Sequence, residues 1–262
     1  MPTNLRASAF AFLTLLSVSA LRGAEPVRLR VLSYNIHHGE GIDGRVDLER
    51  IAGAIVSARA DLVALQEVDC EVSRSGSIDQ PAELARLTGM HVAFGGNIEL
   101  QGGRYGNAVL SRHPIMEHEN HLLPRFDDGE QRGVLVAKTK IPGVGETLLF
   151  LATHFDHRSG DGERVASARA INKLIPGDQI ALLAGDLNDD AASATLSLLE
   201  TVWSRTNHDL IATVPVDHPT RQIDFVLYRP GDRWRVVKTR TLEEAVASDH
   251  RAILAELSLR PK

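Results

Sequence analysis

Cysteine is almost absent from this sequence of 262 residues, in which Cys70 stands alone. A single cysteine excludes an intramolecular disulfide and a cluster of thiolate metal ligands, so an oxidising compartment would not endanger the fold. No basic residue adjoins Cys70 in the sequence to activate it as a nucleophile. We therefore interpret Cys70 as a small apolar residue of the core.

Aromatic residues and an excess of basic charge are also lacking. Phe, Trp and Tyr make up 5% of the chain, and 29 basic residues face 34 acidic ones, for a net charge of −5. Nucleic-acid-binding proteins usually show a broad basic surface, and those that bind unpaired bases add aromatic stacking platforms. Cations bound at an acidic site invert the local charge, so nucleic acid is a disfavoured but not an excluded partner.

Long apolar runs are absent except at the N-terminus. There Arg6 precedes the apolar segment 7–21, the order of a secretory signal peptide, and the segment is short for a bilayer span. Small residues predict cleavage after Ala20 or Ala24. We expect a signal peptide over residues 1–24, one domain over 25–262, an exported protein (periplasmic or secreted) and no membrane span in the mature chain. A buried N-terminal helix is the alternative.

Short apolar segments of strand length alternate with helical patterns along the rest of the chain. No linker or repeat interrupts them, which favours a single α/β domain with sheets enclosed between helical layers. Three segments without periodicity are expected to be loops that select the substrate, namely 98–106, 124–131 and 206–221. The predicted strands are 27–35, 61–67, 107–111, 133–140, 147–154, 179–186, 222–228, 233–238 and 250–257, and the predicted helices start at 47 and cover 81–87, 163–175 and 192–199.

Several predicted strands run directly into polar side chains: Asn35, Glu67, His154, and Asp186 with Asn188. Open sheets place ligand sites beyond the ends of their strands, so these groups are candidates for one pocket. Each signal alone has an ordinary explanation, because an acid after a strand is commonly a helix cap or a turn residue. A lone histidine is more often structural, and Asp186 with Asn188 also fits an Asx-turn.

Seven short motifs, taken together and in order, resemble the endonuclease/exonuclease/phosphatase superfamily across essentially the whole mature chain. Any one of them is commonplace, whereas the ordered set is specific. They are Ser33-Tyr34-Asn35, Leu65-Gln66-Glu67-Val68, Gly106-Asn107-Ala108-Val109-Leu110-Ser111-Arg112, Thr153-His154, Gly185-Asp186-Leu187-Asn188-Asp189, Ile223-Asp224-Phe225 and Ser248-Asp249-His250-Arg251.

The resemblance implies a fold and a metal site. The fold would be a four-layer α/β/β/α sandwich of two packed mixed sheets flanked by helices. Glu67 would be the principal ligand of Mg²⁺ or Mn²⁺, with Asn35 and Asp249 close to the metal. Carboxylate and amide oxygens suit such a hard cation.

The resemblance also implies roles in phosphoester hydrolysis. His250 would be the acid–base histidine, oriented by Asp224, and His154 would stabilise charge on the phosphoryl oxygens. Asp186 and Asn188 would position or activate the attacking water and hold the phosphate. The sequence leaves open whether Asp186 or His250 takes the proton of the water.

Departures from the family patterns argue against two subfamilies of the superfamily. Inositol-polyphosphate 5-phosphatases carry Tyr-Arg where this chain has Asp189-Asp190, and Pro-Val where it has Ala252-Ile253. Abasic-site repair nucleases share only the core motifs, and an export signal would be unusual for them. The run from Tyr34 to Gly39 looks most like the bacterial exported metal-dependent hydrolases of the superfamily.

Five further residues have two interpretations each. His37 and His38 are either additional metal ligands or neutral residues beside the metal or the substrate. Arg104, Arg132 and Arg158 are either phosphate contacts or, as is commoner, solvated surface residues.

Three functions follow as hypotheses. The first is a phosphodiesterase that acts on a small or lipid-linked phosphoester substrate, the second is an exported nuclease, and the third is a catalytically inactive binding module. Every matched polar position holds a competent side chain, which disfavours the third. Acidity and few aromatics favour the first over the second. No sequence feature indicates the oligomeric state.

Overall fold

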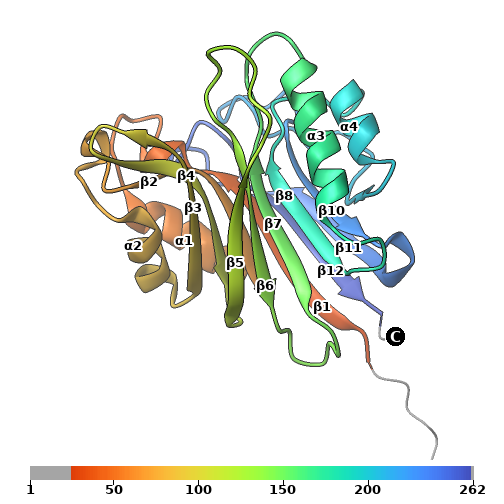
Figure 1. Ribbon diagram of the computed structural model, residues 1–262. Helices are drawn as coiled ribbons and strands as arrows, with labels where there is room; N and C mark the ends of the chain where they lie inside the picture. The colour runs from red at the N-terminus through yellow and green to blue at the C-terminus, as the bar shows by residue number, and fades with distance from the viewer. Residues whose placement is uncertain (1–24, 261–262) are drawn as a thin grey trace, which may run out of the picture.

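A computed structural model describes residues 25–260 and shows two six-stranded sheets packed face to face, with helices on the outside (Figure 1). The predicted signal peptide, residues 1–24, lies outside the described residues. Within residues 25–260, no helix has the length and apolar character needed to cross a membrane.

The first sheet has the strand order β11-β12-β1-β2-β4-β3. Strands β1 and β2 are parallel, and the other neighbours are antiparallel. Its strands are β1 (Val27–Asn35), β2 (Leu62–Cys70), β3 (His91–Leu100), β4 (Gly103–Ser111), β11 (Trp234–Thr241) and β12 (Ile253–Leu259).

The second sheet has the order β5-β6-β7-β8-β10-β9. It repeats the mixed pattern, since β7 and β8 are parallel and the other neighbours antiparallel. Its strands are β5 (Ile115–Leu122), β6 (Gly133–Thr139), β7 (Leu148–His154), β8 (Ala181–Asp186), β9 (Ser204–Arg205) and β10 (Asp224–Arg229).

Helices α1 and α2 cover the first sheet, and α3 and α4 cover the second (Figure 1). The sequence predicts the start of α1 well, because the Asp47 side chain accepts from the Arg50 N–H at 2.9 Å and caps the helix. The α-helices are α1 (Leu48–Ala58), α2 (Gln80–Thr88), α3 (Gly162–Leu174) and α4 (Ala194–Leu199), and the 3₁₀ turns are η1 (His37–Gly39), η2 (Ser73–Ser75) and η3 (Gly231–Arg233).

The alternation of side chains along β1 shows how the layers are held together. Leu29 and Val31 pack into the core between the two sheets, whereas Leu32 and Tyr34 pack toward α1 and α2. Alternate residues of a strand face opposite sides of a sheet, so one strand contributes to two cores. The predicted four-layer sandwich of two packed mixed sheets is confirmed.

One predicted loop is wrong. Residues 98–106 form the end of β3, a tight turn and the start of β4 rather than a loop. Gln101 and Gly102 both have positive φ, of 47° and 88°, which is the geometry of a two-residue hairpin turn. Strand β3 lies at the edge of its sheet and is largely half-exposed, so its polar residues concealed the strand pattern.

Candidate active site

The strand directions bring the predicted site residues to one end of both sheets. Parallel β7 and β8 end together, so His154 lies opposite Asp186. Strand β10 is antiparallel to β8 and begins with Asp224, also opposite Asp186. Strand β12 is antiparallel to β1, so the segment before it, with His250, returns to the end of β1 at Asn35.

Asn35 joins the two sheets at this end. Its side-chain Nδ2 donates to Glu67 Oε1 at 2.9 Å, on the same sheet, and to Asp186 Oδ2 at 3.1 Å, on the other. Its main-chain oxygen accepts from the Ser248 hydroxyl at 2.7 Å. Because Asn35 is fully buried, its amide holds two carboxylates from different sheets in fixed positions.

A β-bulge sets the direction of Glu67. The pairing of β2 with β4 shifts between Leu65 and Val68, and Glu67 has a φ of 59° within that interval. A bulge twists a strand locally and redirects one side chain. Glu67 is accordingly only half-buried within an otherwise buried strand.

The oxygen donors at this end fit a hard divalent cation. Glu67 and Asp186 converge on one amide, and within residues 25–260 neither Glu67 nor Asp249 forms an ion pair with a lysine or arginine. Asp249 is exposed, and its carboxylate Oδ1 lies 3.4 Å from the Ser248 hydroxyl oxygen. Converging carboxylates repel one another, and a bound cation removes that repulsion.

A second group at the same end is buried and is also able to hold a metal ion. The ligand atoms of Asp186, Asp224 and His250 all lie within 4.8 Å of one another. His250 Nδ1 lies 2.9 Å from Asp224 Oδ2, and its Nε2 lies 3.7 Å from Asp186 Oδ2. The predicted contact between Asp224 and His250 is therefore present in the structure.

The electrostatics keep His250 charged. Burial by itself would lower the pKa of His250, but the Asp224, Asp186 and Asp249 carboxylates outweigh burial and raise that pKa to about 10. An imidazolium carries a hydrogen on both nitrogens, so His250 donates to Asp224 through Nδ1 and presents Nε2–H to the site. At neutral pH this histidine is an acid.

Asp186, in contrast to His250, is shifted toward its neutral form. Burial and the nearby Asp224 carboxylate raise its pKa to about 7, although His250, the Asn188 backbone N–H and the Asn35 side chain favour its charged form. Asn188 donates its backbone N–H to Asp186 Oδ1 at 2.9 Å, which confirms the Asx-turn. A carboxylate that titrates near neutral pH is suited to proton transfer.

Burial and Arg132 hold His154 in its neutral form. Arg132 Nη1 lies 3.1 Å from His154 Nδ1, and arginine can only donate, so this contact favours a lone pair on Nδ1. The neighbours of Nε2 have opposite preferences, because the donor Asn188 Nδ2 lies 3.0 Å away and the acceptor Asp186 Oδ2 lies 3.5 Å away. Burial, Arg132 and His250 keep the pKa of His154 well below its ordinary value.

The interpretation of Arg132 as a solvated surface residue is wrong. Arg132 is 3% exposed, and it contacts Glu130 and His157 as well as His154. Its place directly before β6, a buried strand next to β7, is the signal that the sequence offered. Arg104 is exposed and stacks over Phe94, so the surface interpretation is confirmed for that residue.

Arg158 is paired with two carboxylates of its own neighbourhood. It pairs with Asp156 at 3.0 Å and with Glu163 at the start of α3. Both partners are buried, so Arg158 fixes the segment between β7 and α3.

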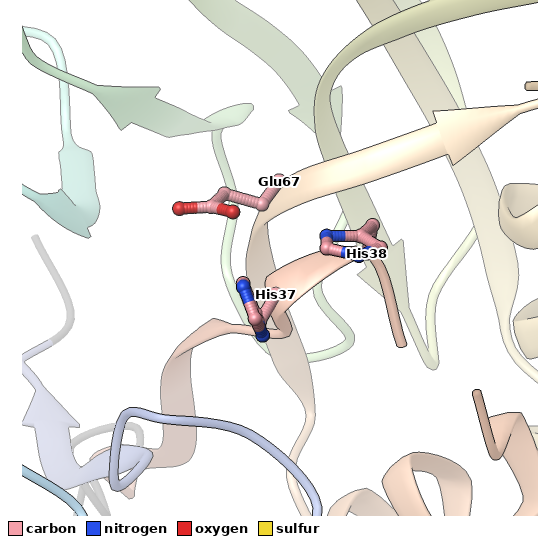
Figure 2. A group of neighbouring side chains, drawn as sticks. All are labelled: His37, His38 and Glu67. Atoms are coloured by element: carbon pink, nitrogen blue, oxygen red, sulfur yellow. The ribbon is translucent and has the colours of Figure 1, made fainter. Parts of the chain in front are cut away.

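The two consecutive histidines after Asn35 come together with Glu67. The ligand atoms of His37, His38 and Glu67 all lie within 4.8 Å of one another, and Figure 2 shows the three side chains grouped around one space. The His37 backbone N–H donates to Asn35 Oδ1 at 3.0 Å. The same asparagine therefore contacts this group and the carboxylates described above.

Comparisons with known proteins agree with this geometry. The uncharacterized protein YbhP of Escherichia coli strain K12 is 29% identical over 247 residues, which cover 88% of this chain and 96% of YbhP. An endonuclease/exonuclease/phosphatase from Beutenbergia cavernae DSM 12333 has 27% identity and a TM-score of 0.75, covering 88% of this chain and 72% of its own.

A second solved structure also shares the fold. The mannosyl-6-phosphatase Bt3783 of Bacteroides thetaiotaomicron VPI-5482 has 21% identity and a TM-score of 0.72, covering 87% of this chain and 99% of its own. The sequence profile of the Endonuclease/Exonuclease/phosphatase family matches residues 32–250, which include every predicted site residue. This chain belongs to the endonuclease/exonuclease/phosphatase family, whose members are metal-dependent phosphoester hydrolases.

Proposed function

We propose that this protein is a divalent-metal-dependent hydrolase of phosphoester bonds, and specifically a phosphodiesterase that acts on a small or lipid-linked substrate. The observation that carries the proposal is the buried Asp224–His250 pair, 2.9 Å apart, beside Asp186 and across from the Asn35–Glu67 contact. This arrangement brings together a proton donor (His250), a proton acceptor (Asp186) and oxygens able to bind a metal, at the end where the two sheets meet.

Asp186 and His250 divide the proton transfers. Asp186, with a pKa near neutrality, takes a proton from the water whose oxygen attacks phosphorus. His250, with its raised pKa, gives the Nε2 proton to the departing ester oxygen as the P–O bond breaks. The Asp224 carboxylate stabilises the charged imidazole before the transfer and fixes its orientation.

His154 and the metal act on the phosphoryl oxygens. The neutral His154 points its Nε2 toward Asp186, where a hydrogen on Nε2 would donate to an oxygen that gains charge. Asn35, Glu67 and Asp249 would hold the metal. When bound, Mg²⁺ or Mn²⁺ supplies positive charge to the same oxygens.

A small substrate is supported by charge and by one relative. The net charge of −5 gives no broad basic surface for a polynucleotide. The mannosyl-6-phosphatase that shares the fold is named for a small phosphorylated sugar. A monoester substrate is the alternative that this name raises, and aryl mono- and diesters compared side by side distinguish the two.

Metal removal tests the proposal. Hydrolysis of an aryl phosphodiester should vanish with a chelator and return with Mg²⁺ or Mn²⁺. Glu67→Gln should chiefly raise the metal concentration needed for half-maximal rate, because it removes one charge from the ligand set. Glu49→Gln, on the exposed face of α1, is the matched control and should behave as wild type. Full activity after exhaustive chelation would overturn the proposal.

We also propose that the protein is exported. The support is the charged-then-apolar order of residues 1–24. N-terminal sequencing of the mature protein should begin near Leu21 or Glu25, in material recovered outside the cytoplasm. An intact Met1 on protein recovered from the cytoplasm would contradict export.

A further inference from the structure

His38 has a buried ring nitrogen that no group of the described chain satisfies. Its side chain is 10% exposed, and its Nδ1 has neither a hydrogen-bond partner nor contact with solvent. A buried polar atom without a partner costs free energy, so a native protein normally supplies one. The unsatisfied Nδ1 of His38 therefore points to a partner that does not come from the described chain.

One residue, Glu40, sets the tautomers of both histidines. The main-chain oxygen of Glu40 lies 3.2 Å from His37 Nδ1, and its carboxylate Oε2 lies 3.2 Å from His38 Nε2. Both oxygens accept, so each of these nitrogens carries the hydrogen. The lone pairs of the neutral rings are consequently on His37 Nε2 and His38 Nδ1.

This arrangement is what metal-binding histidines need. A ligating imidazole normally donates its other N–H to a carboxylate or a main-chain oxygen, which fixes the ring and makes the lone pair more basic. His38 has the carboxylate partner and His37 the main-chain partner. Figure 2 shows a nitrogen of the His38 ring turned toward Glu67 and His37.

The backbone at the three residues is held in an uncommon conformation. His37, His38 and Glu67 have φ of 45°, 45° and 59°, in the left-handed region that non-glycine residues rarely adopt. The buried Gln80 locks this conformation, since its Nε2 donates to the His38 oxygen at 2.7 Å and its Oε1 accepts from the Asp69 N–H. Such strain persists where surrounding structure enforces it, often at ligand sites.

We propose that His37, His38 and Glu67 form a second cation site, selective for a divalent transition metal such as Zn²⁺, beside the set of oxygens that suits Mg²⁺. Two imidazoles and one carboxylate, with a position left for water, form a donor set of zinc sites. Bond lengths of about 2.0–2.1 Å place tetrahedral ligand atoms about 3.4 Å apart. Since the ligand atoms here lie within 4.8 Å, small side-chain rotations close the site.

The two cations would share Glu67. Its Oε1 faces the Asn35 amide at 2.9 Å, on the side of the predicted Mg²⁺ site, while the same carboxylate belongs to the histidine group. A shared carboxylate is a common feature of two-metal phosphoesterases, in which the second cation holds a further oxygen of the substrate. The site itself is defined by donor geometry, so it stands independently of the proposed hydrolysis.

Metal titration without substrate tests the site. The untagged full chain is stripped of metal, saturated with Mg²⁺, and titrated with Zn²⁺ by calorimetry and with Co²⁺ by visible absorption. Imidazole prefers zinc and cobalt to magnesium, so one equivalent should bind despite excess Mg²⁺, with a Co²⁺ spectrum that indicates nitrogen ligands. No uptake of either metal under these conditions would overturn the proposal.

Variants assign the binding to these residues. His38→Ala and, separately, His37→Ala should lower Zn²⁺ affinity by at least about 100-fold, and Glu40→Gln by roughly 10–100-fold, with circular dichroism unchanged. His91→Ala, an exposed histidine, is the matched control. If His38→Ala fails to fold, the half-exposed His37 provides the decisive variant. Unchanged Zn²⁺ affinity in the folded histidine variants would also overturn the proposal, whatever the activity on phosphodiesters.

Discussion

Asp224 and His250 lie on separate segments that only the fold brings together, and their 2.9 Å contact predicts a shared effect on turnover. Asp224→Asn keeps the shape of the side chain but removes the charge that holds His250 protonated, so turnover should fall by roughly two to four decades. His250→Ala should cost at least as much. The double variant should lose little more than His250→Ala alone, because the two residues act as one unit.

The measurement is steady-state turnover of an aryl phosphodiester at saturating Mg²⁺, with folding checked by thermal denaturation. If Asp224 only closed a turn, Asp224→Asn would stay folded with near-normal turnover. Losses that multiply in the double variant would likewise remove the pair from the mechanism.

The buried Asp186 carboxylate should reduce the stability of the folded protein above neutral pH, as the cost of its proposed role in proton transfer. Its folded pKa is raised from 3.8 to about 7 by burial and by Asp224, so from pH 4 to 7 the unfolded chain loses the proton that the folded state keeps. Stability contributed at this position therefore falls as pH rises through that window and stays low above it. Asp186→Asn removes the titration and should stabilise the folded protein by roughly 1–3 kcal/mol near pH 8.

Denaturant unfolding of the chelator-treated protein at pH 5 and pH 8 measures this effect. The gain from Asp186→Asn should be clearly larger at pH 8, while activity is lost. A gain that is equal at both pH values, or a loss of stability at pH 8, would show that the buried carboxylate is already stabilised as an anion.

At the scale of single elements, Gly185 controls the spacing of the two strands that carry His154 and Asp186. A Cβ at Gly185 would lie 2.1 Å from the main-chain oxygen of Thr153, so β7 and β8 would have to separate. Gly185→Ala should therefore destabilise the protein by roughly 2 kcal/mol or more and reduce turnover by moving both side chains.

Gly53 provides the comparison, because it lies exposed within α1 and a Cβ there would meet nothing within 4 Å. Gly53→Ala should stabilise the protein by roughly 0.5–1 kcal/mol and leave turnover unchanged. Thermal unfolding and turnover of both variants check the pair of predictions. A well-folded, fully active Gly185→Ala protein would show that the close approach of the strands is not required.

The strands that the sequence predicts and those it misses differ in their neighbours. Strands β7 and β8 are buried on both faces and appear in the sequence as nearly continuous apolar runs. Strands β3 and β5 lie at the edges of the sheets, and β5 is mostly exposed with polar residues throughout. Edge strands are specified by the neighbour they pair with, which a local pattern does not contain.

At the scale of the whole molecule, the weakly acidic surface predicts the response to salt. A long polynucleotide would contact several phosphates beyond the one that is cleaved, and its apparent affinity would fall steeply with salt. A small phosphodiester engages roughly one phosphate, so its KM should depend only weakly on salt concentration. We expect shallow dependence and feeble cleavage of DNA. Efficient, strongly salt-sensitive degradation of plasmid would identify a nuclease instead.

The ordered motifs predict which residues meet, but not how they are held. The contact of Asp224 with His250 was predictable from the family resemblance, and the structure contains it. The buried Arg132 that contacts His154 was not, because burial of an arginine depends on the β6–β7 pairing around it. The metal ligands Asn35, Glu67 and Asp249 remain a prediction, and so does the export signal.

The pairing of β1 with β12 makes the candidate site depend on two segments that are synthesised far apart in time. Asn35 on β1 receives its hydrogen bond from Ser248, and His250 follows two residues later, shortly before the last strand. A chain made from its N-terminus would therefore lack the proposed proton donor until residue 250 had been synthesised. Under the proposed export, a chain that crosses a membrane with its N-terminus first would complete the proposed site only on the far side.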